Sequence, residues 1–191
     1  MPLPSPSTVL ASLRRIPPLF GVWVPLVIVL ADQLTKWLAT RAFGLPMNIC
    51  AVDPYIERQG LKIEVSPVAD LSLLCNQGVS WGLLQGDSVL KRWALFLFAV
   101  VMVAVIYNIL STARDALSRW SLALLIGGAV GNAIDRALFG AVTDFVNASD
   151  VGFNYVFNVA DAAITFGIIG MAVVILRDWR AERAAAAAEP D

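Results

Sequence analysis

Long apolar stretches alternate with polar segments along the chain. Four of these stretches stand out, and they cover about 18–42, 91–110, 121–138 and 157–176. An α-helix needs roughly 20 mostly apolar residues to cross the hydrocarbon core of a membrane. Helices are favoured there because they satisfy their own backbone hydrogen bonds. The pattern therefore predicts an all-α membrane protein, built as a bundle of four transmembrane helices.

The segment between the first two stretches, about 43–90, has a different periodicity. Apolar and polar residues alternate over 61–65, after a Gln-Gly turn at 59–60, and 68–75 offers a second strand. A connector of this length usually has structure of its own. We expect a small extracytoplasmic β-sheet inserted between helices 1 and 2, followed by Trp81 at the membrane interface.

Basic residues indicate how the chain is oriented in the membrane. They lie before the first stretch, between the second and third, and after the fourth: Arg14, Arg15, Arg114, Arg119, Arg177, Arg180 and Arg183. The segment 43–90 has only Arg58 and Lys62, and 139–156 has neither Lys nor Arg. Because cytoplasmic loops carry the excess of basic residues, we expect both termini in the cytoplasm. The expected divisions are a cytoplasmic segment 1–16, one membrane domain over 17–178 and a cytoplasmic tail 179–191.

The composition supports this class and excludes others. Of the 191 residues, 58% are hydrophobic and only 15% are charged, against roughly 25% charged residues in soluble domains. A net charge of −1 gives no basic excess that would favour nucleic acid. The chain has no histidine, which excludes Ser-His-Asp and Cys-His hydrolases and zinc sites with histidine ligands.

The chain has two cysteines, Cys50 and Cys75. Two are too few for a disulfide framework or a four-thiolate metal site. We expect them to be small buried apolar side chains. The alternative is a single disulfide, formed in an oxidising compartment.

Two aspartates, Asp144 and Asp161, flank the short loop between the last two apolar stretches. A carboxylate at a bilayer is costly and is often functional. Two of them at one membrane face could carry out acid–base chemistry together. The alternative is that Asn158 only caps the fourth helix and Asp161 only favours its dipole. Capping alone would leave Asp144 unexplained.

Other polar residues lie inside the apolar stretches. Asp32 and Lys36 are four residues apart on the first helix and therefore share a face. They form either a structural pair or a brace for an active site, and Lys36 would keep Asp32 ionised.

The third stretch carries Asn132, Asp135 and Arg136 on one face, after glycines that include Gly128 and allow close helix packing. These residues either satisfy one another or serve a site. Asn76 belongs to a Gly-rich turn or holds a substrate backbone through its amide.

These polar residues occur in four motifs: DQLTK at 32–36, NQGVSWG at 76–82, GNAIDR at 131–136 with AVTDF at 141–145, and FNVAD at 157–161. The ordered set resembles the signature stretches of the lipoprotein signal peptidase family, also called signal peptidase II. The resemblance covers roughly 20–178. The chain departs from the usual pattern at Cys75 and Gln77, where a basic residue and a threonine are usual, and in the outer loops 43–74 and 147–155.

The resemblance implies an intramembrane aspartic endopeptidase of the bacterial inner membrane, with its active site near the periplasmic face. Such an enzyme removes signal peptides from diacylglyceryl-modified prolipoproteins and cleaves before the lipidated cysteine. It uses no cofactor or metal ion. Its partners are the precursor and membrane lipid, with no nucleic acid, and we expect a monomer.

The resemblance also implies roles for individual residues. Asp144 and Asp161 match the family's catalytic pair, and Asp135 is the competitor to Asp144. Arg136, beside Asp135, would keep that carboxyl ionised. The residues that match substrate-binding or site-supporting positions are Asp32, Lys36, Asn76, Gly128, Asn132, Asp135, Arg136 and Asn158.

A small four-span proton-coupled transporter or channel is the rival hypothesis, because buried Asp and Arg residues also mark proton relays. No internal repeat is visible in the sequence, although many transporters have one. The acidic residues also gather at one face and do not line a path across the membrane. A non-catalytic assembly scaffold would not need carboxylates on facing helix ends.

Overall fold

The computed structural model describes residues 20–78 and 89–188. Its long helices are α2 (Phe20–Ala42), α4 (Val89–Thr112), α5 (Ala116–Phe139) and α6 (Val159–Ala188). All four are long and apolar enough to cross a membrane. The predicted four-helix membrane bundle is confirmed, and each helix contains or closely overlaps the apolar stretch that predicted it.

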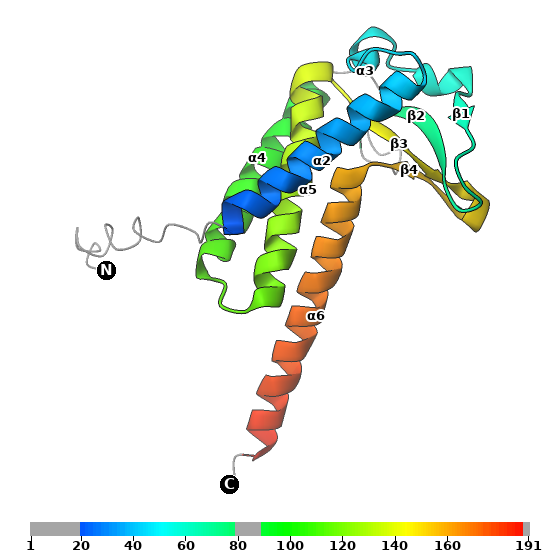
Figure 1. Ribbon diagram of the computed structural model, residues 1–191. Coiled ribbons are helices and arrows are strands. Elements are labelled where there is room, and N and C mark those ends of the chain that lie inside the picture. The colour runs from blue at the N-terminus through cyan, green and yellow to red at the C-terminus, as the bar shows by residue number, and fades with distance from the viewer. Residues whose placement is uncertain (1–19, 79–88, 189–191) are drawn as a thin grey trace, which may run out of the picture.

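Helix α5 is the central element of the bundle, because it packs against α2, α4 and α6 (Figure 1). Half of its membrane-crossing window is buried inside the protein, whereas only 6% of the corresponding window of α4 is buried. Most of the exposed side chains of α4 are apolar. Such a surface is suited to contact with lipid tails.

A four-stranded antiparallel sheet lies at one end of the bundle, here called the sheet end (Figure 1). Its strands are β1 (Lys62–Ile63), β2 (Asp70–Asn76), β3 (Val142–Ala148) and β4 (Phe153–Phe157), in the order β1-β2-β3-β4. Short helices precede β1 and separate β3 from β4: α3 (Ile49–Val52), η1 (Ile56–Gln59) and η2 (Ser149–Val151). The turn between α4 and α5 and the end of α6 lie at the opposite end.

The extramembrane sheet between helices 1 and 2 is confirmed, but it recruits two strands from a second loop. β1 and β2 correspond to the strands predicted in the first insertion, and Gly60, with φ of 63°, ends η1 at the predicted turn. β3 and β4 lie between α5 and α6, where no strand was predicted. The first four residues of β3 are all buried. Because both faces of the strand are covered, its sequence lacks the alternation that reveals a half-exposed strand.

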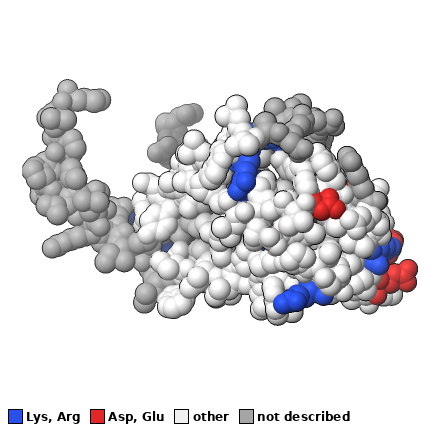
Figure 2. Space-filling view, turned by 90° about the horizontal axis from the view of Figure 1, so that it is seen from above, with Lys and Arg blue, Asp and Glu red and all other residues white. Residues whose placement is uncertain are grey.

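Apolar side chains join the sheet to the helices. A buried cluster brings together the end of α2, the short helix α3, and the strands β2 and β3: Ala39, Ile49, Cys50, Ile56, Leu73, Cys75, Ala141 and Phe145. Viewed from the sheet end, the surface carries few and scattered charged side chains (Figure 2). The apolar cluster therefore anchors the sheet to the bundle and holds the ends of β2 and β3 over the helix ends.

Helix α6 continues beyond the predicted fourth span. Residues 179–187 are helical and exposed, so most of the predicted tail is a solvent-accessible extension of α6. The predicted interfacial Trp81, the N-terminal segment 1–16 and the last three residues lie outside the described residues.

Candidate active site

Helix α6 begins with a reciprocal cap at the sheet end. The Asp161 backbone N–H donates to Asn158 Oδ1 at 2.9 Å, and the Asn158 N–H donates to Asp161 Oδ2 at 3.4 Å. This arrangement satisfies backbone groups that a helix N-terminus otherwise leaves unpaired. The expected cap is confirmed, but it uses only part of each side chain.

The rest of each side chain faces its neighbours. The Asn158 amide donates to Asp144 Oδ1 at 2.6 Å, and the Asn76 amide donates to Asp144 Oδ2 at 3.1 Å. On the other carboxyl, Asp161 Oδ1 accepts from the Asn132 amide at 2.8 Å. Three asparagines from β2, α5 and the start of α6 therefore hold the two aspartates that the sequence singled out.

Asp144 lies on β3 and is 1% exposed. Burial raises the pKa of this carboxyl to about 8, and the negative charge of Asp161 adds to the effect. Hydrogen bonds from Asn76 and Asn158 and the positive charge of Lys36 act in the opposite direction. The pair thus has a strong physical reason to retain one proton near neutral pH.

Lys36 is a buried cation behind the pair. Its Nζ lies 2.7 Å from Asp32 Oδ2 and 2.9 Å from Asp135 Oδ2, with all three side chains at most 1% exposed. Asn132 Oδ1 also accepts from Lys36 Nζ, at 3.4 Å. Lys36 therefore forms an i, i+4 ion pair with Asp32 and also contacts the asparagine that holds Asp161.

Asp135, the competitor to Asp144, is fully occupied by structural contacts. Besides Lys36, it accepts from the Gln33 amide at 2.9 Å and from the Thr143 N–H at 3.0 Å. The direct ion pair of Asp135 is with Lys36, and Arg136 interacts with Asp135 only electrostatically, without a direct ion pair. Asp135 therefore connects α5 to α2 and to the strand that carries Asp144.

Arg136 acts at longer range. Its guanidinium interacts electrostatically with Asp144, Asp161 and Asp135, and its Nη1 donates to the Asn132 carbonyl at 3.3 Å. Its own carbonyl accepts from Arg92 Nε at 2.7 Å. Arg136 is a positive charge beside the site, held in place at the end of α5.

Glycines allow the three helices to meet at this point. A Cβ on Gly128 would collide with the Ala160 carbonyl oxygen and would lie 2.7 Å from Ile164 Cγ1, both on α6. A Cβ on Gly131 would lie 2.8 Å from Asp32 Oδ2. Gly128 therefore supports the site through helix packing, as small residues do in membrane bundles.

A cavity of about 390 Å³ opens beside the two carboxyls. Its polar wall contains Asn76, Asp144 and Asp161. The remaining wall is mostly apolar and aromatic: Phe153, Tyr155, Val156, Phe157, Ala162, Thr165 and Phe166. Asp135, Asp32 and Lys36 are not among the lining residues, so of these carboxyls only Asp144 and Asp161 border the cavity.

Sequence reasoning missed several of these residues. Gln33 lies inside the first motif, and an amide within an apolar span could have signalled a partner. Arg92 donates to the Arg136 and Ala137 carbonyls at the end of α5, a favourable place for a cation. The aromatic side chains of β4 were missed because the strand itself was not predicted.

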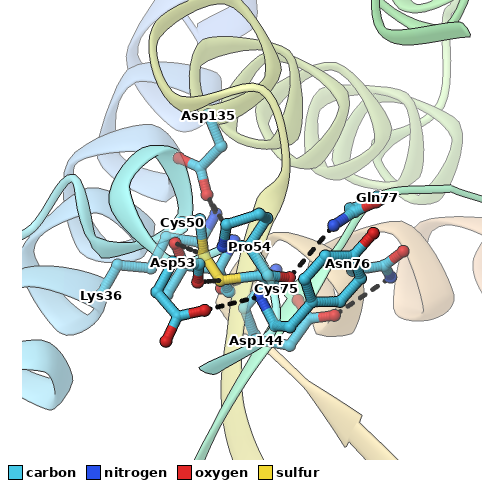
Figure 3. Close-up of a disulfide and its surroundings, with 12 residues drawn as sticks. Lys36, Cys50, Asp53, Pro54, Cys75, Asn76, Gln77, Asp135 and Asp144 are labelled. Atoms are coloured by element: carbon cyan, nitrogen blue, oxygen red, sulfur yellow. Dashed lines mark hydrogen bonds and ion pairs between the residues drawn. A yellow bond between two sulfur atoms is a disulfide. The ribbon is translucent and has the colours of Figure 1, made fainter. Parts of the chain in front are cut away.

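The two cysteines also differ from the expectation. They are buried, at 2% and 5% exposure, but Cys50 and Cys75 form a disulfide with a Cα–Cα distance of 5.4 Å (Figure 3). The alternative reading of this pair is therefore correct. Burial alone could not distinguish the two readings, because the pairing depends on α3 folding back over β2.

The geometry suits acid–base chemistry on a polar bond. Two carboxyls border one cavity, one of them is strongly disposed to hold a proton, and fixed amides surround both. Within residues 20–78 and 89–188, no three His, Cys, Asp or Glu side chains are grouped in a way that could hold a metal ion.

Comparisons with known proteins agree with the motifs. The profile of the family described as signal peptidase (SPase) II matches residues 24–177. A lipoprotein signal peptidase of Methylobacterium sp. strain 4-46 is 39% identical over 168 residues, covering 87% of this chain and 98% of the relative. The lipoprotein signal peptidase of Bacillus subtilis strain 168 is 32% identical over 158 residues, covering 81% and 92%.

Solved structures give the same result. Two structures described as bacterial membrane enzymes superpose with TM-scores of 0.67 and 0.62, at 26% and 28% identity. Each covers 83% of this chain, and the match spans 88% and 93% of the solved chains. The four membrane-crossing helices, the ordered motifs and the matches over most of the chain together show that this bacterial-type, multi-pass membrane protein belongs to the signal peptidase II family of peptidases.

Proposed function

We propose that the chain is an aspartic endopeptidase that removes signal peptides from diacylglyceryl-modified prolipoproteins, cleaving before the lipidated cysteine. Asp144 and Asp161 are the catalytic pair. The observation that carries the proposal is that these two carboxyls, and not Asp135 or Asp32, line the cavity. The names of the relatives supply the substrate class.

The mechanism follows from the charge state of the pair. Two close carboxyls resist double ionisation, so the pair keeps one proton. The ionised carboxyl takes a proton from a water molecule, which attacks the scissile carbonyl carbon. The protonated carboxyl donates a hydrogen bond to the carbonyl oxygen and then protonates the leaving nitrogen. Acid–base assistance of this kind contributes on the order of 10²–10⁴-fold in rate.

Asparagine side chains hold the two carboxyls in position. Asn76 and Asn158 position Asp144, and Asn132 positions Asp161. The buried positive charge of Lys36 keeps Asn132 in place and limits the cost of bringing several carboxyls together. Fixed donors require little rearrangement during the reaction, which is the main advantage of a preorganised site.

The location of the cavity, beside the lipid-facing surface of α6, suits a substrate that carries acyl chains. The catalytic carboxyls lie at the sheet end of membrane-crossing helices, and the cavity wall continues onto Phe166, which is 65% exposed on the surface of α6. Two acyl chains would hold the modified cysteine at a constant depth, each buried methylene contributing roughly 0.8 kcal/mol. Such anchoring positions the scissile bond beside the pair.

The topology belongs to the same proposal. The sheet end faces the periplasm, both termini lie in the cytoplasm, and the protein resides in the bacterial inner membrane. The catalytic membrane domain spans 17–178, flanked by cytoplasmic segments 1–16 and 179–191. One chain supplies both carboxyls and all their hydrogen-bond partners, so we propose a monomer that works without a cofactor.

The transporter hypothesis has less support. The family is one of peptidases, and the polar network is concentrated at the sheet end of the bundle. A proton or substrate path would also require polar groups toward the opposite end of α5, where the buried residues are mainly small or apolar.

The test compares Asp144→Asn, Asp161→Asn and Asp135→Asn in purified, detergent-solubilised protein. Cleavage of a diacylglyceryl-modified precursor should fall at least 10²-fold in the first two variants, because acid–base catalysis is lost, while they remain folded. Asp135→Asn should mainly lower the thermal midpoint or the yield. Near-normal turnover by Asp144→Asn or Asp161→Asn would refute the catalytic pair.

A further inference from the structure

The Cys50–Cys75 disulfide lies directly behind the polar wall of the cavity. It joins α3 to β2 across 25 residues of sequence. Figure 3 shows it beside Asn76 and Asp144, with Asp53 and Pro54 on the adjoining loop. The Thr143 hydroxyl lies 3.5 Å from Cys50 Sγ and can donate to it.

The disulfide is adjacent to both partners of the hydrogen bond between Asn76 and Asp144. Cys75 immediately precedes Asn76, whose amide donates to Asp144. In the β2–β3 ladder Cys75 is opposite Thr143, which immediately precedes Asp144. A constraint on Cys75 therefore acts on the donor and the acceptor of the same hydrogen bond.

Asn76 needs such a constraint. It is the last residue of β2, and strand ends open more readily than strand centres. The register between β2 and β3 also shifts between Leu71 and Leu74, so regular pairing near the site covers only the final residues. Beyond the strand, Gln77 donates to the Pro54 carbonyl at 3.1 Å, which attaches the next residue to the α3 side.

We infer that the Cys50–Cys75 disulfide is a positioning element of the peptidase. It fixes the end of β2 against α3, keeps Asn76 hydrogen-bonded to Asp144, and makes the rate of cleavage depend on the oxidation state of the two cysteines. The inference rests on the proposed function, because it assigns the disulfide a role in that reaction.

The redox step is an ordinary thiol–disulfide exchange. A dithiol reductant breaks the S–S bond, supplies two electrons and two protons, and becomes a disulfide itself, leaving two thiols on the protein. Both sulfurs are buried, so the bond is slow to reduce in the folded protein and is formed in an oxidising compartment.

The titration of Asp144 reports the position of Asn76. The charged groups that act on Asp144 are Asp161 on α6, Lys36 on α2 and Arg136 on α5, and Asp135 is already paired with Lys36. None of these groups is attached to the disulfide. Losing the Asn76 donor removes a group that stabilises ionised Asp144, so the titration midpoint should move upward.

The first experiment is a mutant cycle with four proteins: wild type, Cys50→Ala/Cys75→Ala, Asn76→Ala, and the triple variant. Loosening one fixed donor should lower kcat about tenfold in the double cysteine variant, less than the 10²–10³-fold typical of deleting such a donor. KM should stay within about twofold. In the Asn76→Ala background, removal of the disulfide should change kcat by less than about twofold.

Two controls separate positioning from general stability. Lys62→Met removes the ion pair with Asp70 at the far end of β2, which joins Nζ and Oδ2 at 2.8 Å, and should lower stability while leaving kcat unchanged. Wild-type protein reduced by dithiothreitol, with reduction verified by alkylation and mass spectrometry, keeps both sulfur atoms. It should lose activity as the double variant does and recover it after reoxidation.

A second measurement needs no substrate. The carboxyl carbons of ¹³C-labelled aspartates are titrated by NMR, with Asp144→Asn used for assignment. The Asp144 midpoint should move upward when the disulfide is removed, in the double variant or in reduced wild type. If wild type does not cleave the lipid-modified precursor, the proposed function fails, and this titration still decides whether the disulfide positions Asn76.

Three results would overturn the inference. The first is wild-type kcat and an unshifted Asp144 midpoint in both disulfide-free forms. The second is an equal loss of kcat with and without Asn76, which would assign the effect to another contact. The third is a loss of kcat in Lys62→Met as large as in the cysteine variant, because general destabilisation would then account for both.

Discussion

At the scale of single residues, each buried charged side chain of this site has a specific hydrogen-bond or ion-pair partner. Lys36 lies between Asp32 and Asp135, and its amide neighbour Asn132 continues to Asp161. Unpaired, any of these charges would be too costly to bury. Asp144 differs from the others. Unlike Asp32 and Asp135, it has no direct ion pair with Lys36: its hydrogen bonds come from two neutral amides, and burial disfavours its ionised form.

The pH dependence follows from that difference. Burial, reinforced by Asp161, raises the pKa of Asp144 to about 8. Cleavage needs one proton on the pair, so kcat/KM should fall as pH rises above about 8. Asn76→Ala should move this alkaline limb to higher pH while lowering kcat, since the Asn76 amide favours the ionised carboxyl.

The same shift has a consequence for stability. The folded protein holds the Asp144 proton more tightly than the unfolded chain, so this contribution is fully present below the ordinary pKa of 3.8 and is lost as pH rises toward 8. Thermal unfolding of wild type and Asp144→Asn should show wild type losing stability relative to the variant over that interval. A difference that does not change with pH would contradict the raised pKa.

Secondary-structure elements differ in how well the sequence predicted them. The four membrane helices were predicted because a span of roughly 20 apolar residues has few alternatives. The first two strands were predicted in part, by alternation over 61–65 and 68–75. β3 was missed because it lies inside the sheet, between β2 and β4, and its first four residues are buried. The candidate site could be predicted from motifs, but the disulfide depends on α3 folding back over β2, and the Asn76–Asp144 contact depends on β3 pairing with β2.

The site requires close contact between α5 and α6, because Asn132 on α5 holds Asp161 on α6. Gly128→Ala should force the helices apart at the Ala160 carbonyl, cost about 1–3 kcal/mol of stability, and lower kcat at least tenfold. Gly170→Ala is the matched control in the same helix pair. Its Cβ would meet the Ser121 hydroxyl, which can rotate away.

Thermal unfolding and precursor cleavage measure both variants. A Gly128→Ala protein with normal kcat would show that the carboxyl geometry tolerates a wider spacing of α5 and α6. A Gly170→Ala protein with an equal loss of kcat would show that spacing anywhere along the interface, and not at the site, is what matters.

At the scale of the whole molecule, the sheet unites two loops that are distant in the sequence. β1 and β2 precede α4, whereas β3 and β4 follow α5, and they pair in one antiparallel sheet. This pairing brings Asn76 to Asp144 across 68 residues. The polar groups of the described residues therefore meet at the sheet end of the bundle, and the proposed function requires that end to face the compartment where the precursors present their cleavage site.

The orientation can be tested with new cysteines, because the native pair is held in a disulfide and does not react with maleimides. Val151→Cys lies on η2 and is exposed at the sheet end, whereas Ala116→Cys and Ala184→Cys lie on exposed positions toward the opposite end. A membrane-impermeant maleimide should label Val151→Cys in intact spheroplasts. It should label the other two only after permeabilisation, because the basic residues near these positions predict a cytoplasmic location.

Wild type is the control and should remain unlabelled in both conditions. Labelling of Ala116→Cys or Ala184→Cys in intact spheroplasts, with Val151→Cys protected, would reverse the topology. The carboxyl pair would then lie at the cytoplasmic face, where a reducing environment would also open the Cys50–Cys75 bond. Correct orientation is thus a condition that the proposed catalytic pair and the disulfide share, and one labelling pattern tests it for both.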